Sequence, residues 1–167
     1  ADSKTAAYAF TTLNVVPGIM EHQGARIQLL DIPGIIEGAT KGSGKGKEVL
    51  SVVRNADLII ILLDNDALAQ HQIITKELYK AGFRLNAKRP EVAVKKSERG
   101  GLRVDFSMKS HELGAETVRE VLKEYKIING DVLIRQNITI DELVDAVSKD
   151  RVYIQALIMI NKIDTMD

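Results

Sequence analysis

Two short groups of polar residues have the types and spacing of a ligand-binding site. Asp31 and Gly34 form a DxxG pattern, and Asn161, Lys162 and Asp164 form an NKxD pattern near the end of the chain. Each NKxD side chain has a task on a guanine base. Asp164 can accept hydrogen bonds from the ring N–H and the exocyclic amine together, Lys162 can lay its aliphatic stem along the base, and Asn161 can fix the loop and reach the ring. Together the patterns predict a guanine-nucleotide site.

Each pattern also has a simpler interpretation. A lone DxxG is most often a turn, and Asn161 with Asp164 could cap a helix that follows a strand. Both patterns, however, come directly after aliphatic segments of strand length, where α/β sheets bind their ligands. This shared position and their order along the chain favour the nucleotide site.

The first third of the chain predicts a hairpin and a helix. Residues 14–22 and 25–31 are short apolar segments on either side of Gln23-Gly24, a pair typical of tight hairpin turns. A glycine-rich loop follows Asp31, and the spacing of apolar residues predicts a short helix over 47–53.

Two aliphatic segments predict the strands of a parallel sheet. The run at 57–64 is typical of a strand buried on both faces, and a helical pattern ending at Gly82 follows it. The segment 152–160 predicts another strand, which ends at the NKxD group. We therefore predict an α/β fold in which helices cover both faces of the sheet.

Residues 84–149 interrupt this pattern and predict a small inserted α+β domain in the order ββαβα. Two alternating segments on either side of Gly100-Gly101 predict an extended hairpin. Thr139 and Glu142 have the spacing of a capping box at the start of the last helix. The preceding helix is expected to have one apolar side, formed by Val118, Val121, Leu122 and Tyr125.

Composition restricts the class of protein. The 167 residues contain 23 basic and 23 acidic side chains, so no net positive charge attracts the chain to nucleic acid or anionic lipid. The chain has no cysteine and therefore no disulfide framework. The longest apolar run, Leu58 to Leu63, is far too short for a membrane helix. We expect a cytoplasmic protein that does not contact membranes.

The stretch 84–103 raises alternatives to nucleotide binding. It holds seven basic and two acidic residues, and Phe83 and Phe106 flank it. Such a stretch could bind RNA or the ribosome, or it could be a solvated hairpin face. A third interpretation is a protein-interaction module without nucleotide function, which predicts no effect of nucleotide on any partner.

Longer segments resemble a known family. "YAFTTLNVVPG", "IQLLDIPGIIEGATKGSGKGKEVL" and "INKID" are similar to the switch I, switch II and base-recognition segments of Obg-related GTPases, especially the developmentally regulated GTP-binding subfamily. "EYKI", "DVLIR", "DELVD" and "DRVY" also resemble its members, so the likeness covers nearly the whole chain. The subfamily carries an inserted domain resembling a ribosomal-protein fold at the place of 84–149. The implied organisation is a GTPase domain at 1–83 and 150–167 around that insertion.

The resemblance implies ligands and residue roles. GTP or GDP would bind with Mg²⁺, and the parent protein would hydrolyse GTP in work linked to translation or ribosomes. Thr12 takes the place of the switch threonine that binds the metal, Asp31 reaches the same ion through water, and Gly34 meets the γ-phosphate. Ile35 stands where many small GTPases have a catalytic glutamine. Related GTPases with this replacement hydrolyse GTP slowly alone, and some recruit a monovalent cation such as K⁺ or a regulatory protein partner, so we assign no catalytic residue.

The first motif of the family is missing from the sequence. Its P-loop reads GxxxxGK followed by Ser or Thr, whereas Lys45 is followed by Gly46 and Lys47 by Glu48, without a glycine at the required distance. The P-loop strand would lie between the strand ending at Asp31 and the strand 57–64, so we expect a gap in the sheet there. We expect the chain to be the inner part of a GTPase that, isolated, binds and hydrolyses GTP poorly.

Overall fold

The computed structural model describes residues 16–32, 44–64, 69–109 and 111–165. The chain divides into two compact units, which we call the first unit (Ala1–Asn86 with Ile154–Asp167) and the second unit (Ala87–Tyr153). The described part of the first unit contains a two-stranded and a three-stranded sheet, and that of the second unit a three-stranded sheet.

The first unit begins with the predicted hairpin. β1 (Val16–His22) pairs antiparallel with β2 (Ala25–Asp31). Gln23 and Gly24 connect them with φ values of 48° and 83°, the left-handed pair that a two-residue turn of the I′ type requires. The sequence prediction of this turn is confirmed.

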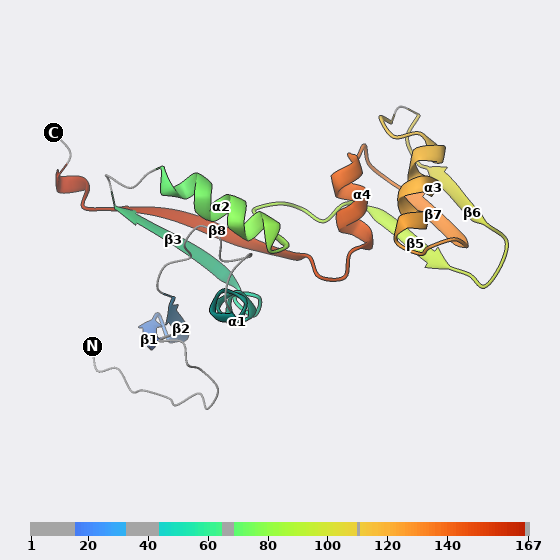
Figure 1. Ribbon diagram of the computed structural model, residues 1–167. Helices are drawn as coiled ribbons and strands as arrows, with labels where there is room; N and C mark the ends of the chain where they lie inside the picture. The colour runs from blue at the N-terminus through green and yellow to red at the C-terminus, as the bar shows by residue number, and fades with distance from the viewer. Residues whose placement is uncertain (1–15, 33–43, 65–68, 110, 166–167) are drawn as a thin grey trace. The chain divides into compact units, whose positions relative to one another are not determined.

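The second sheet of the first unit has the strand order β3-β8-β4. β3 (Leu58–Asp64) runs parallel to β8 (Val152–Asn161), and β4 (Phe83–Leu85) lies on the other side of β8. Helix α2 (Gln70–Lys80) packs against β3 and β4, as Figure 1 shows. A parallel strand pair with a helix packed against its sheet confirms the predicted α/β class.

Asn86, the residue after β4, forms hydrogen bonds to β8 through its backbone and its side chain. Its backbone N–H donates to Ile154 O at 2.9 Å. Its side-chain amide donates to Ala156 O at 2.9 Å and accepts from Ala156 N at 2.8 Å. The side-chain amide thus makes the two hydrogen bonds that the backbone of a paired strand residue would make. The pairing along β8 is thereby extended by the side chain of Asn86.

Burial of β3 differs from the prediction. Ile61 and Leu63 are buried, but Leu58, Ile60 and Leu62 are exposed, Leu62 by 63%. The described residues therefore cover only one face of this strand, and the expectation of burial on both faces is wrong. The described residues also hold no strand between β2 and β3, which belong to separate sheets.

Helix α1 (Gly44–Val53) starts three residues earlier than the predicted helix. Val49, Leu50 and Val53 are buried along one side. Arg54 follows the helix and connects it to the sheet, because its guanidinium donates to Ala81 O at 2.6 Å and lies 5.3 Å from the centroid of the Phe83 ring.

The sheet of the second unit has the order β5-β7-β6. β5 (Val92–Lys96) is antiparallel and β6 (Leu102–Phe106) parallel to the central β7 (Gly130–Ile134). β5 and β6 do not pair with each other, so the predicted hairpin about Gly100-Gly101 is wrong. Alternation fixes which face of a strand is buried but not its neighbour, and the more buried β7 takes the centre.

Two helices cover one face of this sheet. α3 (Ala115–Glu124) lies beside β6, α4 (Ile140–Val147) lies beside β5, and the helices also contact each other. Their core is made of apolar side chains from the helices, the strands and the loops between them: Leu113, Val118, Leu122, Ile127, Val132, Ile134, Ile138 and Leu143. Tyr125, expected on the buried side of α3, is 41% exposed because the helix ends before it.

The start of α4 confirms the capping box. Thr139 Oγ1 accepts from the Glu142 backbone N–H at 3.2 Å, and a Glu142 carboxylate oxygen accepts from the Thr139 N–H at 2.8 Å. Two N–H groups that the first turn leaves unpaired are thereby satisfied.

Candidate functional site

The carboxyl ends of β3 and β8 lie side by side. Their parallel register runs from Leu58 opposite Gln155 to Asp64 opposite Asn161. The last residue of each strand is polar, and both follow aliphatic residues that form the sheet. Carboxyl ends of parallel strands are where α/β proteins bind ligands, so this edge is the candidate site.

The chain turns sharply after β8. Lys162 has φ 56°, in the left-handed region that few non-glycine residues adopt, and a short 3₁₀ helix η2 (Ile163–Thr165) follows. Asn161, Lys162, Ile163 and Asp164 are all exposed. The three predicted base-recognition side chains are thus brought to one exposed loop at the sheet edge.

Lys162 reaches back to the neighbouring strand. Its Nζ donates to Asp64 Oδ2 at 2.7 Å, with 59% of the lysine side chain and 39% of the aspartate side chain exposed. Sequence analysis missed Asp64. The signal was present, because Asp64 ends an aliphatic strand in the same way that Asn161 does.

The remaining predicted residues belong to another sheet or fall outside the described residues. Asp31 is exposed at the end of β2, in the hairpin that forms a sheet of its own. Thr12, Gly34 and Ile35 fall outside the described residues. Within the part of the chain that is described, no group of three or more His, Asp or Glu side chains has the geometry of a metal site.

The NKxD loop has the groups needed to recognise a planar base. Asp164 offers two acceptor oxygens to adjacent N–H groups, and Asn161 offers both a donor and an acceptor. The stem of Lys162 supplies apolar surface close to them. A ligand edge with two neighbouring donors fits this arrangement better than one with a donor beside an acceptor.

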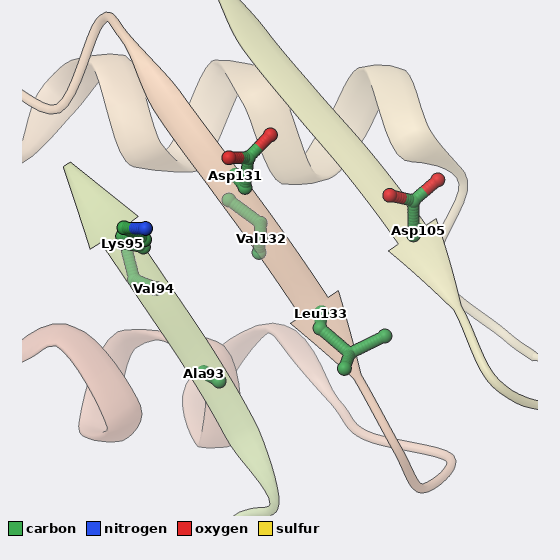
Figure 2. Close-up of a pocket in the computed structure, with 7 residues that line it drawn as sticks. All are labelled: Ala93, Val94, Lys95, Asp105, Asp131, Val132 and Leu133. Carbon is green, nitrogen blue, oxygen red and sulfur yellow. The ribbon is translucent and has the colours of Figure 1, made fainter. Parts of the chain in front are cut away.

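The second unit has a shallow groove of about 340 Å³ on the uncovered face of its sheet. Figure 2 shows Lys95, Asp131 and Asp105 on three neighbouring strands of this face. Lys95 and Arg103 stand opposite Asp131 from its two sides, and Arg103 forms an ion pair with Asp105 at 3.1 Å. Positive and negative groups therefore balance here, and the residues lining the groove include no aromatic side chain on which a base could stack.

The aromatic residues that flank the basic stretch in sequence are either buried or stacked on another side chain. Phe83 is 1% exposed in the first unit, and the Phe106 ring stacks on His111 with 3.7 Å between the ring centroids. Arg84 is 9% exposed, with its guanidinium 3.7 Å from the centroid of the Tyr79 ring. The two aromatic rings that flank the basic stretch in sequence are therefore each packed against other residues or buried.

Two family models match the chain and together cover nearly its whole length. The family described as 50S ribosome-binding GTPase matches residues 1–96, and the C-terminal region of the same domain matches residues 99–167. The chain belongs to this GTPase family. The NKxD loop lies within the second of these matched ranges.

Individual relatives agree with this membership. An uncharacterised GTP-binding protein of Methanocaldococcus jannaschii is 48% identical over 167 residues, which make up 100% of this chain and 43% of that protein. Developmentally regulated GTP-binding protein 1 of Xenopus laevis is 46% identical over 163 residues, 97% of this chain and 44% of that protein. The Dictyostelium discoideum homologue of the latter is 43% identical and is covered to 45%.

These relatives confirm the resemblance to the developmentally regulated subfamily of GTPases. The chain spans less than half the length of each of them. None of the helices in the described part of this GTPase-family chain is long and apolar enough to cross a membrane.

Proposed function

We propose that this chain supplies the base-recognition part of a GTP- and GDP-binding site. The observation that carries the proposal is the NKxD loop at the carboxyl edge of the β3-β8 pair, with Asn161, Lys162 and Asp164 exposed together. Family membership supports it. The whole protein would hydrolyse GTP, and this chain would decide that the nucleotide carries guanine.

Selectivity follows from hydrogen-bond chemistry. Guanine presents a ring N–H beside an exocyclic amine, and the Asp164 carboxylate accepts from both in a charge-assisted pair. Adenine presents an unprotonated ring nitrogen at the corresponding edge, which would face the carboxylate as a second acceptor. The site should therefore discriminate strongly against ATP, because a buried acceptor without a donor is costly.

The phosphate side of the proposal rests on Thr12, Asp31 and Gly34. The Asp31 carboxylate is exposed at a strand end and is the hard oxygen ligand that Mg²⁺ accepts, directly or through water. Bound Mg²⁺ would neutralise charge on the terminal phosphates. Thr12 would be a further oxygen ligand and Gly34 a backbone donor. With Ile35 following Gly34, we propose that hydrolysis in the whole protein depends on K⁺ or a partner group.

Titration with nucleotides tests the proposed base recognition. We expect GDP to shift the backbone NMR signals of Asn161 to Asp164 in the isotope-labelled chain, whereas ADP at equal concentration leaves them unchanged. Affinity should be roughly millimolar, because the backbone donors and lysine of a P-loop are not in this sequence. Equal shifts with GDP and ADP, or shifts confined to other residues, would contradict the proposal.

A ribosomal or RNA partner is a second proposal for the segment 84–103. The family description and the exposed basic residues of this segment, among them Lys88, Lys95, Lys96 and Arg99, support it. Four phosphate contacts predict a slope of about −3 when the logarithm of affinity for single-stranded RNA is plotted against that of salt concentration. Replacing Lys96 and Arg99 by glutamine should make the slope shallower by about half. A slope unchanged by both substitutions would exclude this surface.

A further inference from the structure

Asp64 occupies a special place in the first unit. It ends β3 directly opposite Asn161, yet its carboxylate accepts from Lys162, the residue that follows β8, at 2.7 Å. The two residues are 98 positions apart in sequence. Only the parallel pairing of β3 and β8 brings them together, so the contact depends on the sheet that forms the site.

The contact fixes a side chain that would otherwise be among the most mobile. A lysine side chain has four rotatable carbon–carbon bonds and loses much conformational entropy when it is held. In Lys162 the backbone is set at φ 56° and the ammonium is held by Asp64. The aliphatic stem therefore spans from the NKxD loop to the end of β3.

The ion pair between Asp64 and Lys162 is expected to contribute little to the stability of the fold. Both partners are more than a third exposed, and exposed ion pairs add little to the free energy of unfolding. Orientation of the lysine is the larger effect. A stem that is already ordered can contact a planar base without the entropic cost of being ordered on binding.

We propose that Asp64 is a positioning residue for guanine recognition, which holds the Lys162 ammonium so that its stem forms one wall of the base site. Asp64 does not touch the nucleotide in this proposal. The inference rests on the proposed function, because it assigns Asp64 a part in the same site.

The first experiment requires no nucleotide. NMR relaxation of the side-chain methylene groups should show Lys162 to be more ordered than Lys76, an exposed lysine of α2. Asp64→Asn should make Lys162 as mobile as Lys76, and Asp64→Glu should restore part of its order. A Lys162 side chain already as mobile as Lys76 in the unchanged chain would overturn the positioning role.

The second experiment measures the consequence for binding. We expect Asp64→Asn to weaken GDP binding about three- to tenfold, the effect of ordering one long side chain, with melting temperature unchanged. Combining it with Lys162→Met should add nothing to the Lys162→Met loss. Asp57→Asn, at the exposed residue just before the start of β3, is the matched control and should have no effect.

The outcomes separate the two proposals. If the unchanged chain does not prefer GDP to ADP, the proposed function fails. If it prefers GDP and Asp64→Asn binds as tightly, the positioning role alone fails. Additive losses from the Asp64 and Lys162 substitutions would also overturn that role, because they would show that Asp64 does not act through the lysine.

Discussion

Substitution of Gly130 by alanine is expected to destabilise the second unit strongly. Gly130 has φ 147°, and a Cβ there would lie 2.4 Å from Lys95 O and 3.1 Å from Lys96 Cα. Both contacts are with the backbone of β5. Gly130 lies in the central strand β7 and pairs with β5 on one side and β6 on the other, so the backbone at this position cannot shift without disturbing the sheet. Backbone strain and overpacking each cost about 1–3 kcal/mol, so we expect a loss of about 2 to 6 kcal/mol in the free energy of unfolding.

Chemical denaturation followed by circular dichroism measures this loss. Gly101→Ala is the matched control, because Gly101 also has a positive φ of 76° but nothing lies within 4 Å of its Cβ position. It should show the cost of the backbone conformation without the collision. If both variants lose the same stability, β5 can shift to accept the methyl group and the predicted collision does not decide stability.

Replacing Asp164 by asparagine is expected to remove guanine recognition. Asparagine has the same shape but keeps only one acceptor and turns an amine toward the exocyclic amine of guanine. Hydrogen bonds to charged groups contribute about 1.5–3 kcal/mol, so we expect affinity for GDP to fall about ten- to a hundredfold. In the NMR titration, the GDP-dependent shifts at Asn161 to Asp164 should disappear.

A gain of binding distinguishes this result from misfolding. Xanthine carries a carbonyl oxygen in place of the exocyclic amine, so the asparagine variant should bind xanthosine diphosphate better than GDP. Asp31→Asn provides a second comparison, because it should change the effect of Mg²⁺ on binding and leave the preference for guanine over adenine intact. A variant at position 164 that still prefers GDP would show that another group reads the base.

Local features of the fold could be predicted because neighbouring residues determine them. Gln23-Gly24 supplies the left-handed turn between β1 and β2, and Thr139 with Glu142 caps α4. Each depends on contacts within a few positions, which sequence spacing reports directly. The NKxD group could be placed at a sheet edge for a similar reason, because an aliphatic strand ends at it. Its role as a guanine site, together with those of Thr12, Asp31 and Gly34, stays a prediction.

Strand neighbours could not be predicted in the same way. β5 and β6 alternate as a hairpin would, but their partner is β7, which comes later in the chain and buries more of its surface. The exposed side of β3 was missed because an aliphatic run does not report how many faces of a strand are covered. The buried Arg84 was missed for a similar reason. Its guanidinium stacks on the ring of Tyr79, which lies near the end of α2, and this contact depends on how α2 packs against the sheet.

The sequence by itself determined the family, the α/β class, most helix and strand positions, and the place of Asn161, Lys162 and Asp164 at the end of a sheet strand. These follow from motifs and periodicities that are local in the chain. The tertiary structure alone decided that β7 separates β5 from β6 and that Asp64 binds Lys162. Both depend on pairing between strands distant in sequence, where the free energy comes from burial and backbone hydrogen bonds that no short segment encodes.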